Sequence, residues 1–139
     1  MESVFAQIAP ALSVINTVVF LGVSTAFAVA FLVIYSWITP YDELEMIRSD
    51  NLAAAYSLGG ALVAFILPLN AVVRHSHSLW ELTVWALISL IIQLGVYAVI
   101  HFTMRDMERR MRQGDVAPGA FLGVVHVCAG LLVAASLTP

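Results

Sequence analysis

Four long stretches of the chain, residues 3–41, 52–73, 82–104 and 116–139, contain no Asp, Glu, Lys or Arg. A helix needs about 20 apolar residues to cross a hydrocarbon layer about 30 Å thick, and each stretch is at least that long. Because backbone groups in lipid must be satisfied within their own segment, the spans are expected to be helices. The pattern therefore predicts an all-α, integral membrane four-helix protein.

Composition limits what else the chain can hold. Hydrophobic residues make up 61% of it and charged residues 11%, whereas a soluble domain carries roughly 25% charged residues. We therefore interpret residues 1–139 as a single transmembrane domain, with no room for a soluble catalytic module. The net charge of −3 is small and dispersed, so the lipid bilayer is an expected partner and nucleic acid is not.

The polar residues do not form a recognisable catalytic or metal-binding set. No Ser/His/Asp set, Cys/His pair or pair of carboxylates meets at one depth of the predicted bundle. Cys128 lies two residues from His126, and therefore on another face of a helix, which argues against a shared metal ion. We expect no enzyme activity, no cofactor and no metal site.

Proline and the distribution of arginine set the boundaries and the orientation of the spans. The four predicted spans are residues 11–38, 52–73, 79–102 and 117–136. The first is expected to begin after Pro10 and to end at Thr39-Pro40, because proline cannot continue a helix. Five of the six arginines follow the first and third spans, whereas the opposite side holds only Arg74. The positive-inside rule then places both termini outside, in the periplasm, and the charged connectors in the cytoplasm. The expected cytoplasmic basic cluster is Arg105, Arg109, Arg110 and Arg112.

The two halves of the chain, residues 1–74 and 75–139, resemble each other at an offset of 64 residues. Asn51 and Asp115 occupy equivalent places, each as the expected N-cap of the helix that follows. A unit of two spans returns to its starting side, so the prediction is two parallel two-helix repeats. Gene duplication is one explanation, and the other is that any four-span protein has similar caps at similar places.

Two runs of small and polar residues mark the starts of the second and fourth spans. The first is Asp-Asn-Leu-Ala-Ala-Ala at residues 50–55, followed by Gly59-Gly60 and by Ile-Leu-Pro-Leu at residues 66–69. The second is Gly-Asp-Val-Ala-Pro-Gly-Ala at residues 114–120, where Asp stands at the position at which we expect Asn. In combination they resemble the motifs of the YjfL-like bacterial inner-membrane proteins, the family of domain of unknown function 350.

The resemblance covers residues 19–137 and implies little about chemistry. It implies a four-helix protein of the bacterial inner membrane with no agreed biochemical activity and no catalytic residues to carry over. Relatives tend to be encoded near envelope-stress and peptide-ligase-like proteins, which favours a partner role.

Polar side chains recur every four residues along the third span. Because four-residue steps drift by about 40° around a helix, they form a slowly winding ribbon. One interpretation is the lining of a proton or ion path with Glu81 and His101 at its two mouths. The other places Glu81 and His101 in the interfaces and lets the remaining side chains bond neighbouring helices. The ribbon consists of Glu81, Trp85, Ser89, Gln93, Tyr97 and His101.

His126 lies near the middle of the last span, where a neutral imidazole needs a partner. Gln93 has a comparable depth in the third span and is the expected partner, either in a structural hydrogen bond or in a proton relay. Asn70 follows Pro68 in the second span, where a broken helix would suit an ion site and an ordinary kink is the alternative.

Small residues indicate where helices approach closely. Gly119 and Gly123 form a GxxxG pair on the last span, and Gly59 and Gly60 lie on the second. We expect these two spans to pack centrally against each other; alternatively, one such face joins protomers.

Two functional hypotheses follow. The first is a structural or partner-binding subunit of the cell envelope, as a homo-oligomer or within a membrane complex, with the basic cluster as lipid anchor or docking site. The second is an oligomeric channel or transporter for protons or a small ion or solute. The sequence does not identify a transported species or a partner.

Overall fold

The structure, a computed structural model, describes residues 2–75 and 78–137, with side chains from residue 9 onward. All regular structure in these ranges is helical, as predicted, and four of the helices are long and apolar enough to cross a membrane. The elements are α1 (Glu2–Ile38), α2 (Glu43–Arg48), α3 (Leu52–His75), α4 (Leu79–Thr103), α5 (Met107–Arg112) and α6 (Val116–Ser136).

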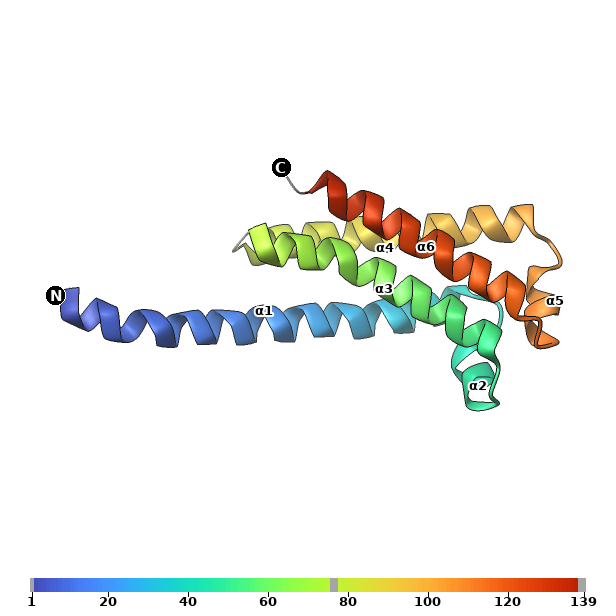
Figure 1. Ribbon diagram of the computed structural model, residues 1–139, viewed down its shortest axis with the longest axis horizontal. Helices are drawn as coiled ribbons and strands as arrows, with labels where there is room; N and C mark the ends of the chain where they lie inside the picture. Colours follow the sequence, from blue (N-terminus) through green and yellow to red (C-terminus); the bar gives the residue numbers. More distant parts are fainter. Residues whose placement is uncertain (1, 76–77, 138–139) are drawn as a thin grey trace.

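The long helices α1, α3, α4 and α6 run along the longest axis of the molecule, and the short helices α2 and α5 lie together at one end (Figure 1). The start of α1, the end of α3, the start of α4 and the end of α6 lie towards the other end (Figure 1). The first part of α1 projects beyond the other three long helices. We call the end that carries α2 and α5 the connector end.

The helix boundaries agree with the sequence in three cases and differ in one. α3 and α4 begin at the expected residues, and α6 begins at Val116, one residue early. α1, however, begins at Glu2 and continues through Pro10, with an apolar span of Ala9–Ile38. Pro10 removes one helical hydrogen bond, but the neighbouring alanine and leucine are strong helix formers and carry the helix through it.

α3 and α6 form the closest helix pair because glycines let their backbones touch, as predicted. A Cβ atom added to Gly119, Gly123 or Gly130 would collide with α3 backbone, and one added to Gly60 would collide with α6 backbone. The expectation for Gly59 is wrong. It is exposed, and nothing lies near its Cα, because one residue turns a helix by about 100° and only Gly60 faces α6.

The two connectors have the same backbone pattern at the offset of 64 residues. The Asn51 amide donates to the Met46 carbonyl and the Asp115 amide to the Arg110 carbonyl, each at 3.0 Å. Asp50, with φ of 61°, and Gly114, with φ of 84°, both take the left-handed conformation just before the cap. The backbone therefore supports the register of the predicted repeat, while its origin by duplication remains a prediction.

The two predicted caps are present. Asn51 Oδ1 accepts from the Ala54 amide at 3.1 Å, and Asp115 Oδ1 accepts from the Ala117 amide at 3.2 Å. Asn51 also donates from Nδ2 to the Met111 carbonyl at 2.8 Å, which ties α3 to the other connector. A hydrogen bond from Arg110 lowers the pKa of Asp115, so this cap is held as a carboxylate.

Candidate functional site: a buried polar core

His126 on α6 is fully buried and contacts polar groups on two other helices. Its Nδ1 lies 2.6 Å from Gln93 Oε1 on α4, the partner that the sequence predicts. Its Nε2 lies 3.2 Å from the Tyr35 hydroxyl on α1. An amide oxygen can only accept, so Nδ1 carries the hydrogen and Nε2 accepts from Tyr35. A neutral imidazole therefore joins α1, α4 and α6.

Ser89 and Tyr97 on α4 surround this centre, and both are buried. The Tyr97 ring meets Tyr35 edge-on at 5.8 Å between centroids. Three polar atoms here, Ser89 Oγ, Gln93 Nε2 and the Tyr97 hydroxyl, are buried with no hydrogen-bond partner among the described residues. Such atoms are costly in an apolar interior, so their presence calls for an explanation.

Two predicted site residues, Glu81 and Asn70, lie apart from this centre, and a third, His101, lies at its edge. Glu81 is exposed in the first turn of α4, where its amide bonds the Ser78 cap, so it lies at the helix end and not along an internal path. Asn70 is exposed on α3. His101 is partly buried and stacks on Tyr97, with 5.6 Å between ring centroids. The polar ribbon of α4 therefore enters the interior only from Ser89 to Tyr97.

Glu43, the first residue of α2, is a buried acid that the sequence analysis missed. It is 0% exposed; its Oε1 accepts from the Ser57 hydroxyl at 2.9 Å, and its Oε2 has no partner among the described residues. Burial raises the pKa of Glu43 to about 7, against the opposing effect of the Ser57 hydrogen bond. A signal was available, because Glu43, Met46 and Ile47 share one face of α2 by their i, i+3, i+4 spacing.

Ser57 also interacts with Tyr35, so it lies between Glu43 and the histidine centre. We refer to these residues together as the polar core: Tyr35, Glu43, Ser57, Ser89, Gln93, Tyr97 and His126.

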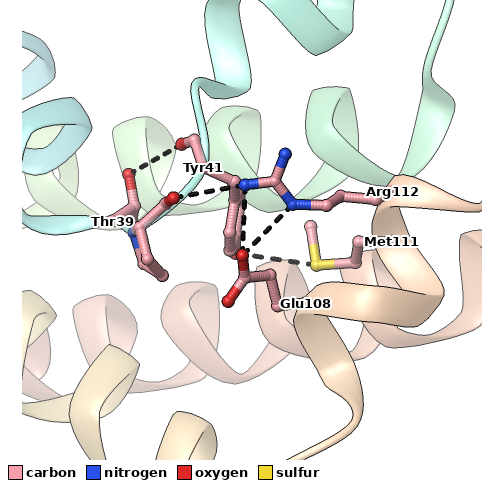
Figure 2. Close-up of polar contacts among 6 residues, drawn as sticks. Thr39, Tyr41, Glu108, Met111 and Arg112 are labelled. Atoms are coloured by element: carbon pink, nitrogen blue, oxygen red, sulfur yellow. Dashed lines mark hydrogen bonds and ion pairs between the residues drawn. The ribbon is translucent and has the colours of Figure 1, made fainter.

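α5 contacts the segment that follows α1 at the connector end (Figure 2). The Tyr41 hydroxyl donates to Met111 Sδ at 3.6 Å, while Arg112 donates to Glu108 at 3.1 Å and to the Pro40 carbonyl at 3.2 Å. Tyr41 is buried, and it interacts with Glu43 on its other side. Tyr41 therefore separates the Glu43 carboxyl from α5.

The basic cluster is largely paired with acids of its own connector. Arg109 bonds Asp106 at 3.2 Å, Arg110 bonds Asp115 at 2.8 Å and Arg112 bonds Glu108 at 3.1 Å. Arg105 is exposed and forms no ion pair within the described ranges. Exposed pairs of this kind contribute little to stability, but they reduce the positive charge available to a partner.

A cleft of about 610 Å³ lies between α1 and α3 in the half of the molecule away from the connector end. Ser13, Asn16, Thr17 and Asn70 contribute to its lining, which is otherwise mostly apolar. Between the cleft and the polar core, Phe31 of α1 stacks on Phe65 of α3. Both rings are buried, with centroids 4.5 Å apart and planes at 10°. We call these two residues the phenylalanine pair.

The whole architecture can now be set beside known proteins. The family described as Domain of Unknown Function (DUF350) matches residues 8–137. The chain belongs to this family. Two proteins named "UPF0719 inner membrane protein YjfL", from Escherichia coli strain K12 and from E. coli O157:H7, are each 33% identical over 119 residues, which is 86% of this chain and 89% of theirs. No solved structure matches the chain.

The polar core of this DUF350 chain suits proton chemistry better than metal chemistry. Among the described residues, no three His, Cys, Asp or Glu side chains are grouped so as to hold a metal ion. Carboxyl, hydroxyl and neutral imidazole groups, in contrast, each donate and accept a proton. They lie in sequence from Glu43 through Ser57 and Tyr35 to His126.

Proposed function

We propose that the chain is a multi-pass protein of the bacterial inner membrane whose polar core forms part of a pathway for protons or another small ion. One observation carries the proposal: buried ionisable and polar side chains follow one another through the bundle, and several of their atoms have no hydrogen-bond partner within the described residues. Polar groups inside a membrane bundle are costly, which makes them candidates for function by default. The curated relatives, named as inner membrane proteins, support the location.

The pathway has two parts separated by an apolar barrier. The polar core serves the half near the connectors, and the α1–α3 cleft serves the other half. Along α1, Phe31 comes between Ala28 of the cleft and Tyr35; along α3, Phe65 comes between Ser57 and Ile66 of the cleft. Hydrophobic constrictions of this kind gate channels by excluding water, so the phenylalanine pair is the proposed gate.

The arginine distribution orients the pathway. Five of the six arginines lie in the connectors, so these face the cytoplasm and the termini face the periplasm. Glu43 then lies on the cytoplasmic side, and the cleft opens on the periplasmic side. The proposal assigns the chain no catalytic chemistry.

Flux through purified protein in liposomes tests the proposal, with a pH gradient first and then with K⁺ and Na⁺ gradients. Tyr35→Phe removes a single hydroxyl from the polar core and is expected to lower flux at least tenfold, because Nε2 of His126 loses its donor. Phe31→Ala is expected to raise flux by opening the barrier. Glu81→Gln is the matched control, since this exposed carboxyl on α4 lies outside the polar core.

Flux equal in wild type and Tyr35→Phe would contradict the proposed pathway. Absence of flux for every ion tested, from protein shown by gel filtration and circular dichroism to be folded, would also reject it. The polar core would then be a set of structural hydrogen bonds between helices.

A partner-binding or structural subunit is the second candidate, and α1 is the observation that favours it. In the most apolar stretch of α1, 11% of the residues are buried, against 50% in α3. Asn16 is exposed within the span of α1, where it lines the α1–α3 cleft, and an amide left open at this depth in the membrane lacks hydrogen bonds. Because an amide both donates and accepts, a second copy of the chain would satisfy it through a symmetric contact.

Disulfide cross-linking tests this second candidate in membranes. In a Cys128→Ser background, Asn16→Cys is expected to form dimers on oxidation, and Val18→Cys, exposed about 200° around α1 from Asn16, is the control. Equal cross-linking at both positions would indicate random collision and would reject the second candidate.

A further inference from the structure

The buried carboxyl of Glu43 is not required by the fold. At the offset of 64 residues, its equivalent is Met107, the first residue of α5, which is 1% exposed. The two connectors therefore bury a side chain of similar length at the same place, apolar in one and acidic in the other. A carboxyl at a position that also suits methionine indicates a role beyond packing.

Within the described ranges, no residue of opposite charge pairs with Glu43. Tyr41 from its own connector, Tyr35 on α1 and Tyr97 on α4 are the titratable groups that interact with it, and Ser57 on α3 donates its hydrogen bond. Glu108 on α5 acts on Tyr41 and Tyr97. None of the four ion pairs in the described part of the chain involves Glu43. The carboxyl is therefore held without a permanent counter-charge.

Space around the carboxyl decides which cation it can take. Glu43, Ser57 and Tyr35 are each 0% exposed, and none of them lines the α1–α3 cleft. A metal cation needs several oxygen ligands and room for its own radius, as coordination numbers of six to eight for Ca²⁺ illustrate. A proton needs no room, because it becomes part of an O–H bond.

We infer that the proton is the species that the polar core takes up, and that Glu43 is the group that first binds it. The inference rests on the proposed function for the subsequent transfer, but not for the binding itself. Oε2, which has no hydrogen-bond partner in the described part of the chain, is the oxygen that takes up the proton, while Oε1 accepts from Ser57.

Transfer onward balances at each group. The transfer begins when the carboxyl turns its protonated oxygen towards Ser57 and the Ser57 hydroxyl turns from Oε1 towards Tyr35. The carboxylic acid then gives its proton to Ser57 Oγ, Ser57 gives its own hydroxyl proton to the Tyr35 oxygen, and Tyr35 gives its own to Nε2 of His126. Each hydroxyl gains one O–H bond and loses one. Glu43 returns to a carboxylate, and His126 becomes an imidazolium that still donates from Nδ1 to Gln93.

Infrared spectroscopy of the reconstituted protein tests the binding step separately from flux. A protonated carboxyl has a C=O band that disappears on ionisation, and the band of Glu43 is expected to titrate with a midpoint near pH 7. Glu43→Gln is expected to remove it. Glu45→Gln, which changes an exposed acid two residues along the same helix, is expected to leave it unchanged. A spectrum with no such band, or a band that survives Glu43→Gln, would overturn the inference whatever the flux.

Flux measurements then test the transfer step. Proton flux is expected to fall at least tenfold in Glu43→Gln and in Ser57→Ala, while Ser57→Ala keeps the infrared band. Flux of Na⁺ or K⁺ without flux of protons would overturn the inference and leave the proposed function standing. A titrating band in a protein that carries no ion would support proton binding by Glu43 and reject the proposed function.

Discussion

The connector of residues 39–51 and the connector of residues 103–115 follow the same backbone plan, but they bury different side chains. In both, the fourth residue, Asp42 or Asp106, accepts through its carbonyl from the amide four residues later at 3.0 Å. Thr39 and Thr103 each return a hydroxyl hydrogen bond to the carbonyl four residues earlier, at 3.1 and 2.7 Å. These shared bonds end a long helix and begin the short helix of each connector.

Three of the differences between the halves concern the polar core. The equivalents of Tyr35, Glu43 and Ser57 at the offset of 64 are Val99, Met107 and Phe121. Val99 and Phe121 are exposed, so faces that carry hydroxyls inward in the first half carry apolar groups outward in the second. The comparison teaches that the common residues suffice for the fold and that the first half has been adapted to hold a chain of proton-binding groups.

Introducing a buried acid into the connector of residues 103–115 should have the largest effect on stability. Met107→Glu would bury a carboxyl with no serine at the place equivalent to Ser57, since Phe121 stands there. Desolvation raises the pKa of such a carboxyl by several units, so ionising it at pH 8 lowers the free energy of unfolding by about 5 kcal/mol. Unfolding in increasing SDS, followed by circular dichroism, measures the loss.

Glu43→Met makes the reverse change and serves as the control. We expect it to be neutral or stabilising at pH 8, because methionine already fits the equivalent site and removes a buried unpaired oxygen. A large loss of stability in Glu43→Met would show that the first connector needs its acid for folding, and the contrast between the halves would fail.

Forcing α3 and α6 apart should have the next largest effect on stability. Gly60→Ala places a Cβ against the α6 backbone at Gly123, which cannot move as a side chain can, and is expected to cost more than about 3 kcal/mol. Gly59→Ala meets open space and should gain slightly, because alanine favours helix. The same SDS titration, run on both variants, checks the pair; equal effects would mean that the two helices do not meet at Gly60.

The pH dependence of stability should also distinguish the two connectors, because only the first buries an ionisable side chain at the position shared by Glu43 and Met107. The folded state raises the pKa of Glu43 from 4.5 to about 7, so it binds this proton more tightly than the unfolded chain does. Stability is therefore greatest below about pH 4.5 and falls as the pH rises through 7, by about 3 kcal/mol in total. Thermal unfolding in detergent at several pH values measures the slope, which Glu43→Met should abolish and Glu45→Gln should retain. A slope that persists in Glu43→Met would assign the titration to another group.

Much of the fold could be predicted because the features that determine it can be read directly from the amino-acid sequence. Stretches without charge define the long helices, proline ends the first of them, and the GxxxG pair of α6 marks its contact with α3. The choice between Gly59 and Gly60 could not be predicted, since adjacent residues differ by about 100° around the helix and the direction of the neighbour is unknown.

The sequence predicted contacts in the candidate site only where two residues lie at the same depth in the membrane. His126 and Gln93 were paired because both lie mid-span, and their contact at 2.6 Å agrees. Glu43 and Tyr35 were missed because residue type suggested solvent for the acid and the interface for the tyrosine. Tertiary contacts overrode both tendencies, as Ser57 and the neighbouring tyrosines enclose the acid.

The turn before each cap offers the smallest and most local test of the repeat. Gly114, with φ of 84°, suits glycine, whereas Asp50 holds the same left-handed conformation with a side chain attached. Gly114→Ala is therefore expected to destabilise by about 1 kcal/mol, and Asp50→Gly to stabilise by up to about 1 kcal/mol. Opposite signs in the SDS titration would show that the two turns are the same element under different local strain. Equal signs would mean that one connector depends on side-chain contacts that its counterpart lacks.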